Sequence, residues 1–285
     1  MILTGIADEA ARDIETQVKA HKELGWSHIE LRLVDGKNVA GELSDSDFDR
    51  VCRVLDRQQI QVTGFASRIA NWSRHISGDF SVDIQDLKAS IPRMQRLGVK
   101  PIRVMSWVGD GVPESEWRAE SIRRMRELAK IAEDGDVLLC HENCTGWGGL
   151  SAENMLELGE RVDSPAFALL YDIGNTISHG LDPEEFFSRI RGEYVYVHVK
   201  DVRRKSAGVP SDDYAFCGEG DANVRSVLST IIGQDGYDGV VSIEPHVAAV
   251  VHSAAESSTP QQMYRSYLKY AELFKQIVAE IVSSE

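Results

Sequence analysis

Cysteine is scarce in this sequence, and acidic residues outnumber basic ones. The 285 residues include four cysteines with no CxxC pair among them, which argues against a disulfide framework and predicts free thiols in a cytoplasmic protein. The first residues also lack the basic start that is typical of a secretory signal. With 31 Lys and Arg against 45 Asp and Glu, the formal net charge is -14, which disfavours nucleic acid and anionic membranes as partners. No apolar run reaches the ~18 residues that a membrane-spanning helix needs.

Short apolar runs rich in β-branched residues alternate with longer amphipathic stretches from one end of the chain to the other. This rhythm predicts eight β/α units and therefore an α/β protein, a single-domain (β/α)8 TIM barrel over residues 1–285. Strands are predicted at 2–7, 28–33, 61–66, 102–105, 137–140, 167–171, 195–199 and 240–243. Helices are predicted at 13–24, 45–58, 82–97, 114–132, 152–161, 183–190, 223–232 and 260–281.

The main competing architecture is an open, doubly wound sheet. Against it, the turn at 7–11 after the first strand has no glycine fingerprint for a dinucleotide, and the chain has no P-loop motif. The glycines and serines of 207–220 predict one long loop after the seventh strand. Pro92 is predicted to kink the helix that contains it.

Acidic or imidazole side chains end the last four predicted strands. Glu142, Asp172, His198 and Glu244 each follow a run of apolar residues that would bury them. In a barrel of this kind the C-terminal strand ends meet at one mouth, so we expect the four side chains to converge there. Buried carboxylates are costly without a compensating cation, and three carboxylates with one imidazole suit Mn, Mg, Co or Zn. The sequence therefore predicts a metal site at the mouth.

Short motifs around these residues resemble a known family. They are HEN at 141–143, YDIGN at 171–175, HVKD at 198–201, GEGD at 218–221, IEPH at 243–246 and, in the second strand, IELR at 29–32. Together they resemble the xylose-isomerase-like TIM-barrel superfamily. Within it the sugar phosphate isomerase/epimerase branch is most similar, a branch that includes D-tagatose 3-epimerase, hydroxypyruvate isomerase and inosose dehydratase.

This resemblance implies one divalent metal, Mn before Mg, Co or Zn, held by Glu142, Asp172, His198 and Glu244. Glu142 and Glu244 would also be the catalytic groups that move protons on a substrate bound to the metal as an enediolate. The implied activity is a sugar or sugar-phosphate isomerase or epimerase. Two alternatives stay open: an inosose-type dehydratase at the same site, and a non-catalytic sugar-binding barrel. The expected partner is a sugar, a sugar phosphate or an inositol derivative.

Further residues near these motifs are predicted to contact the substrate: Asn175, Lys200, Arg204, Glu219 and Trp147. Asn175 stands where the family often has histidine, which argues against the three-metal site of endonuclease IV relatives. For Lys200 a salt bridge to a rim acid is an equally good interpretation, and for Arg204 a solvated surface charge is the better one. Glu219 is explained as well by a tight turn between its two glycines, and Trp147 by a loop anchor.

Several other residues receive no chemical role from the sequence. His141 and His246 adjoin the predicted ligands, so strand alternation turns them elsewhere, and both are interpreted as structural. No sequence pattern around Arg103 indicates a role for it. Trp72 is assigned to packing or to a subunit contact, which leaves a homo-oligomer open.

Overall fold

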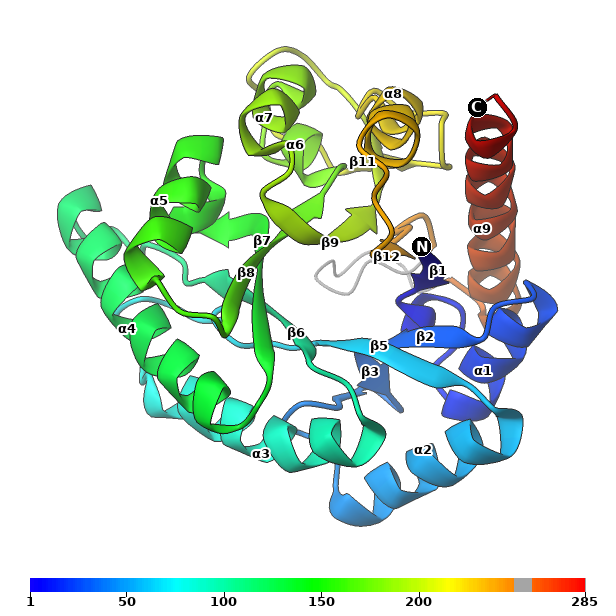
Figure 1. The fold of residues 1–285 in the computed structure, drawn as a ribbon, viewed down its shortest axis with the longest axis horizontal. Helices are drawn as coiled ribbons and strands as arrows, with labels where there is room; N and C mark the ends of the chain where they lie inside the picture. The colour runs from blue at the N-terminus through cyan, green and yellow to red at the C-terminus, as the bar shows by residue number, and fades with distance from the viewer. Residues whose placement is uncertain (249–257, 285) are drawn as a thin grey trace.

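The computed structural model describes residues 1–248 and 258–284, and it is a barrel of parallel strands surrounded by helices (Figure 1). The barrel strands are β1 (Ile2–Gly5), β2 (His28–Leu31), β5 (Gln61–Ala66), β6 (Pro101–Ser106), β7 (Leu138–Gly146), β8 (Phe167–Asp172), β9 (Tyr194–Val199) and β12 (Val240–Ile243). They are hydrogen-bonded in the order β1-β12-β9-β8-β7-β6-β5-β2. A parallel bridge between Ile6 and Glu30 closes the ring between β1 and β2. The predicted (β/α)8 fold is confirmed.

Helices follow the strands around the outside of the barrel. They are α1 (Ile14–Glu23), α2 (Asp45–Gln58), α3 (Ser81–Leu97), α4 (Glu114–Asp134), α5 (Ala152–Val162), α6 (Asn175–Ser178), α7 (Pro183–Ile190), α8 (Val224–Leu228) and α9 (Pro260–Ser283). Their ends follow local chemistry: the Ser44 side chain accepts from the Asp47 backbone N–H at the start of α2. Gly98, with φ of 67°, ends α3, because glycine adopts the left-handed conformation at low cost.

The structure departs from the predicted elements in three places. Residues 207–220 were expected to form one loop, but part of this segment pairs as a hairpin of β10 (Asp201–Arg203) and β11 (Asp213–Ala215). The predicted helix at 223–232 is α8 followed by a π-helical turn at 229–234. Pro92 lies inside α3, which extends from Ser81 to Leu97, and the kink expected there stays a prediction. A second small hairpin, β3 (Leu33–Val34) with β4 (Lys37–Asn38), follows β2.

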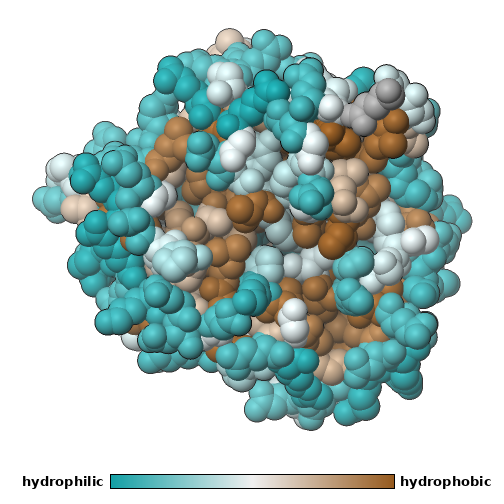
Figure 2. All heavy atoms as spheres, viewed as in Figure 1, coloured by the Kyte–Doolittle hydropathy of each residue, from teal (hydrophilic) through white to brown (hydrophobic). Residues whose placement is uncertain are grey.

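Apolar side chains fill the layer between the strands and the helices. They form two large buried clusters, one under α1 to α5 and one under α7 to α9, and a small one inside the barrel around Cys140, Leu170 and Tyr196. Figure 2 shows polar residues over the outer helices, with hydrophobic residues gathered toward the middle of that face. None of the helices in the described ranges combines the length and the apolar character needed to cross a membrane.

A buried histidine ties the last helix to the first β/α unit. His21, on α1, contacts the His28 carbonyl oxygen through Nδ1 at 2.5 Å and the Tyr267 hydroxyl of α9 through Nε2 at 2.8 Å. Its side chain is completely buried. Burial lowers the pKa of His21 from 6.5 to about 4, because desolvation penalises the imidazolium form. The ring is therefore neutral in the folded protein at neutral pH.

We expect His21 to make the protein sensitive to acid. Because its pKa is lower in the folded state than the unfolded value of 6.5, its contribution is present above pH 6.5 and is lost as the pH falls toward 4. The loss is on the order of 3 kcal/mol in the free energy of unfolding at pH 4. Urea unfolding of the wild type and of His21→Gln at several pH values between 7 and 4 measures it.

The variant is expected to be less stable at pH 7 but to lose less stability on acidification than the wild type. His75→Gln, at an exposed histidine, serves as the control and is expected to keep the wild-type pH dependence. An unchanged acid dependence in His21→Gln would show that another group causes it.

Candidate active site

A cavity of about 690 Å³ opens at the C-terminal ends of the barrel strands. Residues within the strands and directly after them line it, including Arg32 after β2, Arg103 on β6, Glu142 on β7, Lys200 after β9 and Glu244 after β12. Because all eight strands are parallel, every strand delivers its last residues to this same end. The cavity is therefore where the sequence predicted the chemistry to lie.

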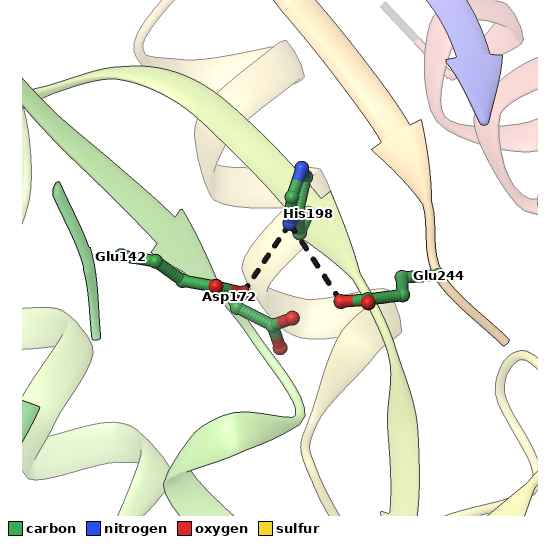
Figure 3. A group of neighbouring side chains, drawn as sticks. All are labelled: Glu142, Asp172, His198 and Glu244. Carbon is green, nitrogen blue, oxygen red and sulfur yellow. Dashed lines mark hydrogen bonds and ion pairs between the residues drawn. The ribbon is translucent and has the colours of Figure 1, made fainter. Parts of the chain in front are cut away.

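The four predicted metal ligands converge in this cavity. Glu142, Asp172, His198 and Glu244 are buried, and one ligand atom from each lies within 4.8 Å of the others. Asp172 and His198 are direct partners in the β8–β9 ladder, which places them at the same height in the barrel. In Figure 3 the carboxylates of Glu142 and Glu244 point toward one another from opposite sides, and His198 lies between them. The His198 Nδ1 atom is 3.4 Å from Glu142 Oε1 and 3.8 Å from Glu244 Oε2.

The donor set fits a divalent cation. Glu142 Oε2 is buried and has no hydrogen-bond partner among the described residues, and the nearest basic atom, Arg103 Nη1, is 3.5 Å away. An unsatisfied buried carboxylate oxygen is costly unless a cation compensates it. Burial raises the pKa of Asp172 to about 6, although Lys200 opposes that shift. Three carboxylates and an imidazole are ligands that Mn, Mg and Zn accept.

Glu30 orients the histidine of this cluster. Both of its carboxylate oxygens lie 3.1 Å from His198 Nε2, on the side of the ring away from the other ligands. The Tyr196 hydroxyl donates to Glu30 Oε2 at 2.9 Å and fixes the carboxylate in turn. Burial alone would lower the pKa of His198, but Glu30 and Glu142 raise it to about 10. The ring thus carries a proton that a bound cation would displace, since a ligating imidazole is neutral.

Two of the five predicted substrate residues lie inside the cluster. Lys200 Nζ is 3.0 Å from Asp172 Oδ2 and 3.0 Å from Glu244 Oε2, and it donates to Asn175 Oδ1 at 3.1 Å. The Asn175 side chain donates to Glu142 Oε1 at 3.3 Å. Both residues line the cavity. The structure therefore brings Asn175 and Lys200 to the predicted place, and the ion pairs of Lys200 are compatible with the salt-bridge interpretation as well.

Two buried arginines that the sequence did not assign belong to the same network. Arg32 donates through Nη1 to Glu244 Oε1, and its other nitrogens pair with Asp8 at 3.0 Å and Glu9 at 3.2 Å. Arg103, for which the sequence showed no pattern, lies 3.5 Å from Glu142 and 3.7 Å from Glu244. The available signal was a charged residue inside a buried apolar strand, as in IELR at 29–32 and PIRVMS at 101–106.

His246 lines the cavity, whereas the sequence left it as structural. Its Nδ1 lies 2.8 Å from Glu9 Oε1, and its backbone N–H donates to Glu9 Oε2 at 2.7 Å. The backbone at His246 has φ of 55°, a conformation that non-glycine residues seldom adopt. Glu9 thus fixes both the main chain and the ring of His246. His141 differs, because it packs against Phe167 and does not line the cavity.

Trp147 does not reach the cavity. It lies in the short turn at 147–149, is 1% exposed and belongs to the hydrophobic core beneath α4 and α5. The Arg118 guanidinium covers its ring at 5.8 Å. Gly148 and Gly149 pack so closely on His141 and Cys144 that side chains there would collide, so this turn needs both glycines. The interpretation as a loop anchor is the one that the structure supports.

Arg204 and Glu219 also lie outside the cavity lining. Glu219 is exposed, and its nearest basic partner is Arg203 at 3.9 Å. The reason is Asp201, whose carboxylate accepts the backbone N–H groups of Gly218 and Gly220 and holds the turn in place. A Cβ atom at Gly220 would lie 2.2 Å from Asp201 Oδ1, so the close approach explains that glycine of the GEGD motif. Neither residue is placed to contact a ligand in the cavity.

Comparison with known proteins agrees with this geometry. The family model described as "Xylose isomerase-like TIM barrel" matches residues 18–267. The chain belongs to this family. The resemblance drawn from the strand-end motifs is therefore confirmed.

The relatives of known sequence in this family include epimerases and dehydratases. L-ribulose-5-phosphate 3-epimerase UlaE of Shigella flexneri serotype 5b is 29% identical over 84% of each chain. Inosose dehydratase of Clostridium tetani is 23% identical over 46% of this chain and 47% of that protein. The chain spans about half the length of several curated relatives that it matches, as in this dehydratase. Both of these relatives are named as enzymes.

Solved structures with the same fold cover the whole chain. A D-tagatose 3-epimerase-like protein superposes with a TM-score of 0.75 and 18% identity, covering 100% of this chain and 99% of that one. The IOLI protein, solved with a zinc atom, gives a TM-score of 0.75 and 16% identity with the same coverage. A structural relative from Mycobacterium smegmatis was solved in complex with magnesium and has a TM-score of 0.69 at 17% identity, covering 99% and 97% of the two chains. At these low sequence identities, the structural similarity shows only that the proteins share the fold.

We expect Glu30 to control metal affinity although it is not one of the four predicted ligands. In Glu30→Gln the neutral amide replaces the carboxylate that orients His198, and Mn²⁺ binding should weaken by about 10- to 100-fold. Calorimetric titration of the metal-free variant with Mn²⁺ measures the dissociation constant.

Tyr196→Phe is the matched control. It removes the hydroxyl that donates to Glu30 but leaves the carboxylate beside His198, so the loss of affinity should be smaller. Equal affinity in Glu30→Gln and the wild type would contradict the orienting role.

Proposed function

We propose that this protein is a metal-dependent enzyme that removes a proton from the carbon beside the carbonyl group of a sugar or polyol. The observation that carries the proposal is the pair of buried glutamates, Glu142 and Glu244, which face one another across the cavity beside Asp172 and His198. Two carboxylates on opposite sides of a bound ring can act on its two faces. The epimerases and dehydratases among the relatives support the same reaction class.

The four predicted ligands would hold one divalent cation, with Mn²⁺ proposed as the resident ion. When bound, it withdraws electron density from a substrate carbonyl and so makes the neighbouring C–H bond more acidic. Zinc and magnesium in related structures support the use of a metal without selecting one. Glu142 Oε2, which lacks a hydrogen-bond partner among the described residues, is the atom most in need of the cation.

Each of the two glutamates is proposed to carry out one of the two proton transfers. One carboxylate accepts the proton from the substrate carbon, and the other returns a proton to the opposite face or to the neighbouring carbon. Arg32 holds Glu244 Oε1 in place, while Arg103 lies between the two carboxylates and offsets their mutual repulsion. Burial alone would raise the pKa of Glu142, but Arg103 and His198 lower it, so the carboxylate is ionised at neutral pH, the form that a general base requires.

The fate of the substrate depends on where the second proton goes. Return to the opposite face of the same carbon gives an epimer, and return to the neighbouring carbon gives an aldose–ketose isomer. Transfer of a proton to a β-hydroxyl expels water and gives a dehydrated ketone. Lys200, with Nζ 3.0 Å from both Asp172 and Glu244, is placed to hold a substrate oxygen in each case. We propose epimerisation or isomerisation first, with inosose-type dehydration as the alternative.

We expect each glutamate to be essential for proton exchange. Glu142→Gln and Glu244→Gln should each slow solvent-deuterium incorporation at the carbon next to the carbonyl by about 10²- to 10⁴-fold, the usual contribution of a general base. NMR of D-tagatose, D-allulose and inosose in deuterated buffer with Mn²⁺ measures the exchange. Glu160→Gln, at an exposed position on α5, is the control and should exchange at the wild-type rate.

The same experiment separates the alternatives. Deuterium incorporation with sugar products supports an epimerase or isomerase, whereas a new conjugated-ketone absorbance supports the dehydratase. Sugar binding without any incorporation would contradict catalysis and favour a sugar-binding barrel.

We expect metal removal to abolish exchange reversibly. Chelation should lower the exchange rate to that of Glu142→Gln, and added Mn²⁺ should restore it, with Mg²⁺, Co²⁺ and Zn²⁺ compared at equal concentration. Elemental analysis of the protein before and after chelation gives the metal content. Full exchange by protein shown to contain no metal would contradict the proposed cofactor.

A further inference from the structure

We infer that the substrate of this cavity is an uncharged polyhydroxylated ketone or aldehyde, and neither its phosphate ester nor a carboxylated sugar. This inference rests on the proposed function and narrows it. Its basis is the state of the basic side chains: each Lys and Arg that lines the described cavity is already paired with a carboxylate. Recognition of a phosphate or carboxylate needs cations that are free to form charge-assisted hydrogen bonds.

At the floor of the cavity the buried carboxylates outnumber the basic side chains. Its buried ion-pair network contains six carboxylates, those of Asp8, Glu9, Glu30, Glu142, Asp172 and Glu244, and three basic side chains, those of Arg32, Arg103 and Lys200. Leaving the two histidines aside, the network is three charges negative, and one divalent cation reduces that excess to one. An anionic group on the substrate would therefore meet a site that is still negative. The hydroxyl groups of a neutral sugar meet no such repulsion.

The rim of the cavity repeats this pattern. Arg68 is ion-paired with Glu42, and Lys205 is 2.6 Å from Asp212 on the opposite side of the mouth. All four side chains line the cavity, so the acids as well as the bases would face a bound ligand. A phosphate at the far end of a substrate would therefore lie close to the carboxylate of Glu42 or Asp212 as well as to the base. The rim thus adds no net attraction for an anion.

The described parts of the two loops that commonly bind phosphate in this fold place no unpaired Lys or Arg in the cavity lining. In (β/α)8 barrels a phosphate site is frequently formed by the loops after the seventh and eighth strands. After Glu244 the sequence has no Lys, Arg or Gly until Arg265, which lies within α9. After β9, Arg203 points to Asp213 at 3.5 Å and to Glu219 at 3.9 Å, and its side chain is half exposed away from the cavity lining.

The remaining lining suits a neutral polyol. Asn38, Asn71 and Ser211 add polar side chains without charge, of which Asn38 and Ser211 are already bonded to the backbone. Trp72 and Met105 offer apolar surface. This mixture of a few placed polar groups with apolar walls is typical of sites for uncharged small molecules. A volume of about 690 Å³ accommodates a sugar ring.

Matched pairs of compounds test the inference. The Mn²⁺-loaded protein is given D-tagatose and D-tagatose 6-phosphate, D-allulose and D-allulose 6-phosphate, and L-ribulose and L-ribulose 5-phosphate. Deuterium exchange gives kcat/KM for each, and ligand-observed NMR gives the dissociation constant. For every pair that reacts, the free sugar should have a kcat/KM at least about tenfold higher than its phosphate ester, since like charges repel.

Equal or better use of a phosphate ester in any pair would overturn the inference and leave the proposed function standing. If no compound exchanges its proton, the proposed function loses its support. The dissociation constants of the free sugars and of their phosphate esters then decide whether the cavity prefers a neutral ligand. Tighter binding of the phosphate esters would overturn the inference in that case as well.

A variant at the rim tests the physical cause. Glu42→Gln releases Arg68 from its partner while the amide oxygen remains able to accept the Asn38 backbone N–H. The ratio of kcat/KM for phosphate ester to free sugar should rise by about two- to fivefold, the scale of an exposed ion pair. Glu15→Gln, which removes one of the two carboxylates paired with Arg50 on the outer surface, is the matched control and should leave the ratio unchanged. An unchanged ratio in Glu42→Gln would overturn the assignment of the preference to the rim.

Discussion

The need to neutralise carboxylates buried at one end of a closed barrel governs the structure around the cavity. Glu142, Asp172 and Glu244 lie where water cannot solvate them, and the protein supplies Arg32, Arg103 and Lys200 in compensation. These cations are themselves desolvated, so each must stay paired. The ion pairs thereby become rigid, and the carboxylates are held in one arrangement before any ligand arrives. A prearranged set of donors of this kind binds a cation without first reorganising.

The barrel makes this arrangement possible because it joins distant parts of the sequence. Glu9 follows the first strand, Arg32 the second and His246 the eighth, yet they are neighbours because β12, β1 and β2 adjoin one another. Glu9 contacts both Arg32 and His246, and Arg32 contacts Glu244. The contacts that close the barrel between β12, β1 and β2 therefore also form part of the cavity wall. Loosening the junction of β1 and β2 would disturb the charged network directly.

The sequence was sufficient to predict which side chains at strand ends come together at the mouth of the barrel. Glu142, Asp172, His198 and Glu244 each end an apolar run, and parallel strands must deliver such residues to one place. Glu30 and Arg103 were missed because they lie within strands, where the direction of a side chain depends on the register of a closed barrel. Trp147 and Glu219 lie away from the cavity, in agreement with the loop-anchor and tight-turn interpretations. Contacts between residues far apart in the sequence, such as that of Asp201 with Gly218, hold these segments in place. Local sequence does not contain that information.

The link between His21 and Tyr267 has a consequence for the stability of the cavity. The Tyr267 hydroxyl, on α9, packs against Gly5 and His21 in the first β/α unit. Removing α9 would therefore expose the first strand and, beside it, the Glu9 that holds His246. An outer helix that contributes no ligand thus protects the residues that shape the cavity.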